Sequence, residues 1–249
     1  TFILGPLLLP DTGFGRLISM EKDTDPFLAG FSHYNLTMTR RFIYSPPVVP
    51  ILLVLNIAVF LLQLSVPGPI LENFALWPMG LPEQVVFDDF APRFQLWQLV
   101  SYSFLHGGVF HIFINMYVLW MFGTRIEQHW GSKAFVIYYF VCVIGAGLVQ
   151  LVVTSMAAST GEIYPTVGAS GGVFGLLLAF ALTFPEERLM LLFPPVTLKA
   201  KWAALIFAGI ELIAGVTGTL EGIAHFAHLG GMLFGFLLLW YWSKHPLKR

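Results

Sequence analysis

Long apolar runs separated by short polar segments make up most of the chain after about residue 47. The six runs are about Val48–Ser65, Val109–Ile126, Ala134–Ser159, Ser170–Phe184, Trp202–Thr217 and Ile223–Trp242. A hydrocarbon core about 30 Å thick requires roughly 20 apolar residues in one helix. The fourth and fifth runs are shorter than this length. The pattern therefore predicts an all-α membrane protein with six spanning helices, of which two are short.

The composition supports a lipid environment. Hydrophobic residues make up 57% of the 249 residues and charged residues only 11%, whereas soluble domains carry roughly 25% charged residues. The formal net charge of -1 argues against a nucleic-acid partner, because phosphate binding requires a basic surface. The single cysteine, Cys142, excludes an internal disulfide.

Basic residues predict how the chain crosses the membrane. With both termini cytoplasmic, nearly all the basic residues that flank the runs fall on one side: Arg40, Arg41, Arg125, Lys133, Arg188, Lys199, Lys201, Lys244, Lys248 and Arg249. The opposite side then holds Arg93 together with the acidic residues Glu72, Glu83, Asp88, Asp89, Glu162 and Glu221. The positive-inside rule therefore favours cytoplasmic termini.

Two regions lie outside the predicted helices. Residues 1–46 are mixed and polar, and we expect a cytoplasmic N-terminal extension that precedes a six-span domain over 47–249. The outer loop from about 66 to 105 carries aromatic residues and methionine among its prolines. A loop of this length with apolar residues is expected to have a function or to lie as a partly helical cap on the membrane surface.

Several strongly polar residues occur inside or beside the apolar runs, where they are costly. They are His106, His111, Asn115, Gln150, Ser170, Glu211, His225 and His228. Ser170 lies sixteen residues before Glu186, and His228 lies sixteen before Lys244. At 1.5 Å per residue, both side chains stand roughly 24 Å above the predicted inner boundary. The two residues are therefore expected at one depth.

The second run brings further polar groups to the same level. His111 lies sixteen residues before Glu127, and Asn115 lies one turn deeper on the same helix face. Three helices thus carry a serine, two histidines and an asparagine at similar depth.

Small residues predict which helices meet. Gly171, Gly175 and Ala179 are spaced four apart in the fourth run, as are Gly231 and Gly235 in the sixth. This spacing lets membrane helices approach closely. If these faces meet, Ser170 and His228 come within hydrogen-bonding distance, as activation of a nucleophile requires.

Three motifs together resemble the rhomboid intramembrane proteases. They are Gly168-Ala169-Ser170-Gly171, His111-x-x-x-Asn115 and Ala227-His228-x-x-Gly231-x-x-x-Gly235, in that family's order and on the second, fourth and sixth runs. The resemblance covers about residues 48–243, and it is strengthened by Trp97 and by Glu127 followed by Gly131-Ser132. It implies a six-span rhomboid bundle that cleaves transmembrane or juxtamembrane segments of membrane proteins, without a cofactor or metal.

The resemblance also implies roles for individual residues. Ser170 is the expected nucleophile and His228 its general base, in a dyad that has no carboxylate partner. His111 and Asn115, with the backbone N–H of Ser170, are the expected oxyanion hole; Gly168, Gly171, Gly231 and Gly235 are supporting residues. With six predicted spans, the chain resembles the simpler prokaryotic form of this family, which implies a location in the plasma membrane.

The chain departs from the family pattern at two positions. Gln98 follows Trp97 where arginine is common, which leaves substrate handling open. Phe174 stands where tyrosine is common, and we expect its ring to pack on His228 without the hydroxyl group.

Single motifs of the chain also fit other interpretations. A G-x-S-x-G nucleophile elbow requires a preceding strand, and the residues before Gly168 are poor strand formers. His225 and His228 have a spacing that metal ligands use, but the chain has no H-E-x-x-H, and we expect His225 to be a hydrogen-bonded residue near the outer mouth. Glu211, inside the fifth apolar run, is also typical of a transporter. The simpler interpretation is a hydrogen-bonded carboxyl that faces another helix. A noncatalytic rhomboid-like protein that binds or escorts membrane helices also stays open.

Overall fold

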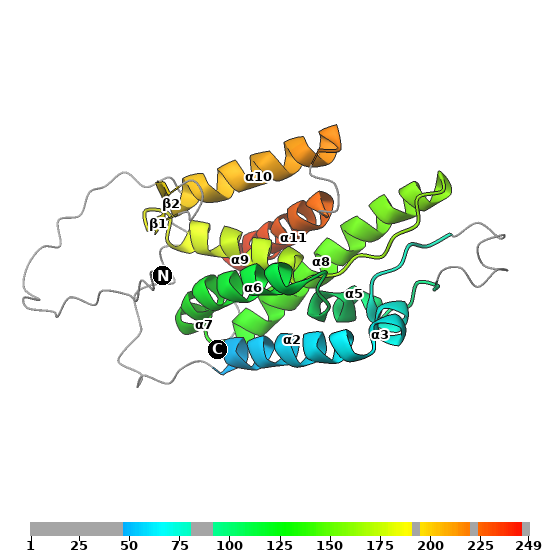
Figure 1. Ribbon diagram of the computed structural model, residues 1–249. Helices are drawn as coiled ribbons and strands as arrows, with labels where there is room; N and C mark the ends of the chain where they lie inside the picture. The colour runs from blue at the N-terminus through cyan, green and yellow to red at the C-terminus, as the bar shows by residue number, and fades with distance from the viewer. Residues whose placement is uncertain (1–46, 81–91, 191–194, 220–223, 246–249) are drawn as a thin grey trace, which may run out of the picture. The chain divides into compact units, whose positions relative to one another are not determined.

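The computed structural model describes residues 47–80, 92–190, 195–219 and 224–245. The predicted extension over 1–46 lies outside the described residues, as does the part of the outer loop from 81 to 91. The described chain is mostly helical, and its helices run roughly along one direction (Figure 1). Its elements are α2 (Val48–Ser65), α3 (Pro67–Phe74), α5 (Gln98–Ser101), the 3-10 turn η2 (Tyr102–Phe104), α6 (Val109–Val118), the π-helical turn η3 (Leu119–Gly123), α7 (Thr124–Trp130), α8 (Ser132–Ser159), α9 (Ser170–Thr183), the strands β1 (Arg188–Met190) and β2 (Thr197–Lys199), α10 (Ala200–Thr217) and α11 (His225–Lys244).

Within the described residues, five helices are long and apolar enough to cross a membrane. They are Val48–Ser65, Val109–Trp130 (α6 to α7), Ser132–Ser159, Ala200–Thr217 and His225–Lys244. The fourth predicted span, α9, has 14 residues and is therefore about 21 Å long, shorter than a hydrocarbon core of about 30 Å. A helix thus forms at each of the six predicted runs, and α9 is too short to cross the core by its length alone.

Helices α8, α9 and α11 pack together at the centre, with α10 against α9 and α11 (Figure 1). Glycines allow the closest approaches. A methyl group on Gly231 of α11 would stand 2.7 Å from the carbonyl carbon of Gly171 in α9, and closer still to its oxygen. The predicted meeting of α9 and α11 is confirmed.

The glycine contacts also include α8, which was not predicted. A methyl group on Gly175 would stand 2.7 Å from the Cβ of Cys142, and one on Gly235 would stand 2.9 Å from the Cys142 sulfur. The Tyr138 hydroxyl donates a hydrogen bond of 2.8 Å to the carbonyl of Gly175. Cys142 is thus a small buried side chain at the centre of a three-helix seam.

Glu127 of α7 links α7 to α2 and α8, at the end of the α6–α7 span that lies away from Ser170. Its buried carboxylate accepts hydrogen bonds from the backbone N–H groups of Val48 (3.0 Å) and Val49 (2.9 Å), at the start of α2. It also accepts one from the Ser132 hydroxyl (2.6 Å), at the start of α8. The N–H groups of a helix's first turn have no partner within the helix, so Glu127 satisfies two of them for α2.

The described part of the outer loop is partly helical, as expected, and is held by Gln98. The buried amide oxygen of Gln98 accepts hydrogen bonds from the backbone N–H groups of Gln95 (3.2 Å) and Trp77 (3.3 Å). The neighbouring Trp97 donates its indole N–H to the carbonyl of Asn73 at 2.9 Å. Gln98, where arginine is common in the family, therefore holds together the two segments of the outer loop that contain Trp77 and Gln95.

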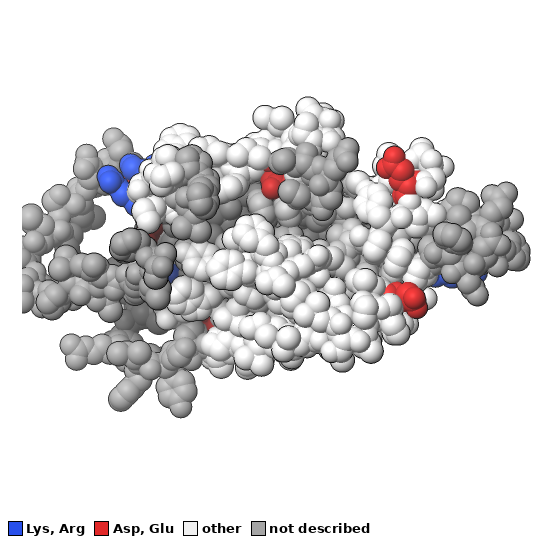
Figure 2. Space-filling model, viewed as in Figure 1, with Lys and Arg blue, Asp and Glu red and all other residues white. Residues whose placement is uncertain are grey.

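Between the ends of the bundle, most of the visible surface in Figure 2 is uncharged, and basic side chains gather at the end that carries β1 and β2. There the hairpin that joins α9 to α10 pairs Arg188 with Lys199 across its two strands. Lys199 lies 2.6 Å from the Glu186 carboxylate, which Lys201 also contacts. A basic end of the bundle fits the predicted inner side, whose orientation in the membrane stays a prediction.

Candidate active site

Ser170 is the first residue of α9, where an extended segment turns sharply into the helix. The turn depends on Gly168, whose φ of 131° is rarely adopted by residues with a side chain. The Gly168 N–H donates to the carbonyl of Tyr102 at 2.9 Å, which fixes the turn against η2. As the first helical residue, Ser170 has a backbone N–H with no acceptor within its own helix.

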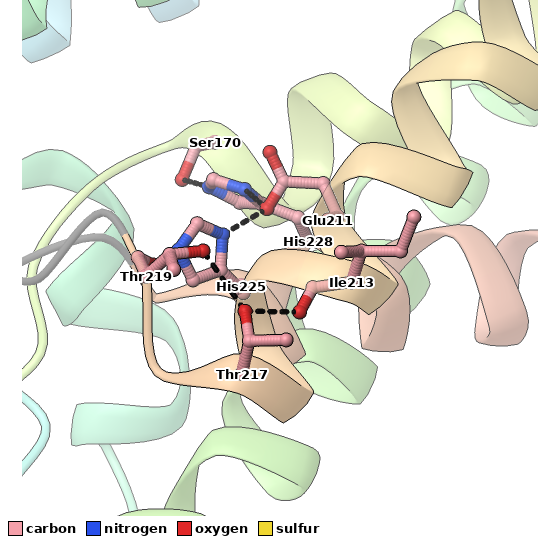
Figure 3. Close-up of polar contacts among 7 residues, drawn as sticks. All are labelled: Ser170, Glu211, Ile213, Thr217, Thr219, His225 and His228. Atoms are coloured by element: carbon pink, nitrogen blue, oxygen red, sulfur yellow. Dashed lines mark hydrogen bonds and ion pairs between the residues drawn. The ribbon is translucent and has the colours of Figure 1, made fainter.

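His228, from the first turn of α11, lies next to this serine (Figure 3). Its Nε2 is 2.8 Å from the Ser170 Oγ, within hydrogen-bonding distance. The Phe174 ring, one turn along α9 from the serine, stacks on the imidazole with centroids 4.2 Å apart and planes 6° from parallel. The expected packing of Phe174 on His228 is therefore confirmed, and the missing hydroxyl does not prevent it.

His111 faces the same site from α6. A Cβ added to Gly168 would lie 3.0 Å from the His111 Nε2 and 3.7 Å from the Ser170 Oγ, so the imidazole and the serine flank one glycine. The Gly107 N–H donates to the His111 Nδ1 at 3.2 Å. An imidazole that accepts at Nδ1 carries its proton on Nε2 when neutral, which gives a donor on the side of the serine.

Asn115 lies one turn further along α6 and is buried. The hydrogen bond that the structure gives its amide nitrogen is to the carbonyl of His111, at 2.9 Å. Gly107, His111 and Asn115 are thus linked by hydrogen bonds within and just before the start of α6. A direct role of Asn115 towards the serine stays a prediction.

The resemblance implied a dyad with no carboxylate partner, but the structure has a carboxylate at ion-pair distance from His228. The Glu211 carboxylate, from α10, reaches across to α11, and its Oε2 lies 2.9 Å from the Nδ1 of His228. The same oxygen is 2.6 Å from the Nδ1 of His225, whose Nε2 lies 3.1 Å from the carbonyl of Thr219 (Figure 3). Glu211 is therefore a hydrogen-bonded carboxyl that faces another helix, and His225 is a hydrogen-bonded residue, both as expected.

Comparison with known proteins assigns the chain to a family. The Rhomboid domain family matches residues 93–245, more than half of the chain and all the site residues above. The chain belongs to the rhomboid family. This rhomboid domain is 32% identical over 188 residues to the rat presenilin-associated rhomboid-like protein, mitochondrial, a match that covers 72% of this chain and 48% of the rat protein.

Relatives in other kingdoms are similarly distant. Rhomboid protein 1, mitochondrial, of Saccharomyces cerevisiae is 32% identical over 151 residues, covering 61% of this rhomboid chain and 43% of the yeast protein. RHOMBOID-like protein 1 of Arabidopsis thaliana is 30% identical over 221 residues, covering 79% and 53% respectively. The rhomboid chain thus spans about half the length of the curated relatives that it matches.

Sequence reasoning missed the contact between Glu211 and His228 in this rhomboid, although it named both residues. The signal was the short connection between α10 and α11, since helices joined by a short loop lie antiparallel and adjacent. Glu211 lies two turns before that connection, and His225 and His228 lie in the first turn after it. All three residues lie within about two turns of this connection, where the two helices are adjacent.

Proposed function

We propose that this rhomboid is an intramembrane serine endopeptidase that cleaves transmembrane or juxtamembrane segments of other membrane proteins. The observation that carries the proposal is the 2.8 Å separation between the Ser170 Oγ and the His228 Nε2. A serine hydroxyl is a weak nucleophile unless a base accepts its proton, and an imidazole at this distance is such a base. Both groups lie within the matched domain, at the meeting point of α9 and α11.

The proposed reaction proceeds in two stages. The Ser170 Oγ attacks the carbonyl carbon of the scissile peptide while its proton passes to the Nε2 of His228. The tetrahedral intermediate collapses, the C–N bond breaks, and the amine leaves with the proton from Nε2. Water then attacks the acyl ester and gives a proton to His228, and collapse releases the carboxylic acid product and returns the proton to the Ser170 Oγ.

The proposed oxyanion hole consists of the Ser170 backbone N–H and the side chains of His111 and Asn115. The position of the His111 Nε2 across Gly168 from the serine supports this role. Donors that are already oriented in a site with little water stabilise the oxyanion strongly, and the loss of one donor typically costs about 10²–10³ in kcat.

The proposed architecture is a six-span domain over 47–249, with residues 1–46 as a cytoplasmic extension and both termini cytoplasmic. The short α9 supports a site that water reaches from the outer side, because a helix of 14 residues leaves part of the membrane thickness unfilled. We propose the plasma membrane as its location. The mitochondrial names of the rat and yeast relatives make a mitochondrial membrane the second candidate, which imaging of a tagged chain distinguishes.

The test is cleavage of a transmembrane reporter by the purified full chain in liposomes. The parent should cleave the reporter, whereas Ser170→Ala and His228→Ala should lose nearly all activity while they keep the thermal stability of the parent. Cleavage that persists in Ser170→Ala contradicts the proposed nucleophile. A well-folded parent that binds the reporter without cleaving it across a panel of transmembrane sequences favours a noncatalytic role in binding membrane helices.

A further inference from the structure

Glu211, His225 and His228 form a buried cluster beside Ser170 (Figure 3). Glu211 comes from α10, and the two histidines come from the first turn of α11. The Glu211 Oε2 lies 2.6 Å from the Nδ1 of His225 and 2.9 Å from the Nδ1 of His228. One carboxylate oxygen therefore faces two imidazoles, and the imidazole of His228 contacts the serine.

The two ring nitrogens of His225 contact different oxygen atoms. Its Nε2 lies 3.1 Å from the carbonyl oxygen of Thr219, which can only accept, so Nε2 carries a proton. Its Nδ1 faces Glu211 at 2.6 Å, and this contact also requires a proton between the two atoms. The short contact therefore pairs the buried carboxyl of Glu211 with the buried imidazole of His225 through one shared proton. A charge buried without such a partner is far more costly.

The same oxygen selects the tautomer of His228. To accept the Ser170 proton, the Nε2 of His228 has to be unprotonated, so its single proton must be on Nδ1. That Nδ1 is buried, and among the described residues it has no well-aligned hydrogen bond. The Glu211 Oε2 is 2.9 Å away, which is an ion-pair distance, but the contact lacks the geometry of a hydrogen bond. Such contacts are often poorly aligned without substrate and tighten when it binds.

We propose that Glu211 is a positioning residue that acts through His228, and that His225 holds Glu211 in place. The inference rests on the proposed protease function. Glu211 keeps the Nδ1 proton of His228 in place, orients the ring towards Ser170 and stabilises the imidazolium that forms when the serine attacks. The catalytic arrangement is then Ser170, His228 and Glu211, with the third group supplied by α10 rather than by the helices that carry the first two.

The three residues could instead hold a metal ion, since their ligand atoms all lie within 4.8 Å of one another. The distances favour the proton-linked arrangement. Two ligands that each lie 2.0–2.1 Å from a tetrahedral zinc stand roughly 3.3 Å apart, whereas the Glu211 Oε2 and the His225 Nδ1 are only 2.6 Å apart. A contact of 2.6 Å is close to the short end of charge-assisted hydrogen bonds, about 2.7 Å.

The first experiment compares steady-state cleavage of the transmembrane reporter by the parent, Glu211→Gln and Glu211→Asp in liposomes. Glutamine keeps the size of the side chain, but its amide can donate to Nδ1 and so favours the wrong tautomer of His228. For the equivalent change in a Ser-His-Asp triad the loss of kcat is about 10⁴-fold, and we expect about 10²–10⁴-fold here with KM within about twofold. Glu211→Asp keeps the carboxylate and should recover at least tenfold over Glu211→Gln.

Gln150→Met is the matched control, because Gln150 is also a buried polar residue within a helix long enough to span, and its side-chain oxygen has no hydrogen-bond partner among the described residues. It should keep the kcat of the parent. His225→Gln should lower kcat less than Glu211→Gln does, and the double variant should be no slower than Glu211→Gln alone, because His225 acts through Glu211.

The outcomes separate the inference from the function on which it rests. An inactive parent contradicts the protease proposal itself. If the parent is active and Ser170→Ala is inactive, a Glu211→Gln variant with the kcat of the parent overturns only the positioning role. The same holds if kcat, KM and thermal stability all deteriorate together in Glu211→Gln and Glu211→Asp. One equivalent of zinc in the purified parent, removed by a chelator together with activity, would overturn it in favour of a metal site.

Discussion

Replacing Gly231 with alanine should separate the two helices that carry the proposed catalytic pair. The added methyl group would stand 2.7 Å from the carbonyl carbon of Gly171 and 3.2 Å from its Cα. These atoms belong to the backbone and cannot rotate away. Carbon atoms in ordinary contact are about 3.5–4.0 Å apart, so α9 and α11 must move apart by on the order of 1 Å. The distance from the Ser170 Oγ to the His228 Nε2, now 2.8 Å, would then exceed a hydrogen bond.

A displacement of this size has a predictable consequence. Misplacement of reacting groups by about 1 Å costs about 10²-fold in rate, and overpacking a core costs about 1–3 kcal/mol of stability. The assay is the rate of reporter cleavage in liposomes, measured together with thermal unfolding. Gly209→Ala is the matched control, because a methyl group on Gly209 of α10 meets no atom within 4 Å and should leave the rate unchanged. Parent-like cleavage by Gly231→Ala would refute the reasoning that the close approach of these helices sets the site.

Three further predictions concern other contacts. Phe174→Leu should lower kcat about two- to tenfold, because it removes the ring stacked on His228 and aromatic pairs contribute about 0.5–1.5 kcal/mol. Phe174→Tyr should keep kcat within about twofold of the parent. Equal rates for the two variants would argue against a role of the stacked ring. Glu127→Gln should destabilise the protein by about 1–3 kcal/mol without changing kcat per folded molecule, because the new amide leaves a backbone N–H of α2 unpaired; Ser132→Ala, which removes one hydrogen bond to the carboxylate, should cost less in thermal unfolding. Hydrogen bonds from Lys199 and Lys201 lower the pKa of Glu186 to about 2. Their stabilisation of the hairpin is therefore present above the ordinary carboxyl pKa of about 4.3 and is lost as the pH falls towards 2. Hydrogen exchange of β1 and β2 should report this loss, and Glu186→Gln should abolish its pH dependence.

Much of the site could be predicted because membrane helices obey a simple length scale. A constant rise per residue, counted from charges that mark one membrane face, places Ser170 and His228 at one depth, and the structure has them in contact. The four-residue spacings from Gly171 and from Gly231 indicated which helices touch, since only residues without side chains allow this approach.

The contact between Glu211 and His228 could not be found by the same count. Lys201 marks the start of α10, and Glu211 lies only ten residues further on, which suggests a depth about 9 Å nearer to the inner side than Ser170. The structure nevertheless has the Glu211 carboxylate 2.9 Å from the His228 Nδ1. Depth along the chain equals depth in the bundle only for helices with the same tilt and starting level, and α10 begins after a hairpin of its own.

The hydrogen bonds by which Gln98 holds the outer loop together could not be predicted from the sequence either. Gln98 accepts from backbone N–H groups on two arms of that loop, and such contacts depend on how the loop folds rather than on residue types. The inclusion of α8 in the glycine seam has a similar origin, because the motif on α9 does not say how many neighbours its glycines face.

The most direct test of the central claim is to map where an active-site probe reacts. A fluorophosphonate forms a stable adduct with an activated serine, and tandem mass spectrometry of the digested full chain locates it. The account predicts one adduct, on Ser170, that is absent in Ser170→Ala and strongly reduced in His228→Ala. An adduct on another residue, or labelling of Ser170 at the parent rate in His228→Ala, would contradict the claim that His228 activates Ser170.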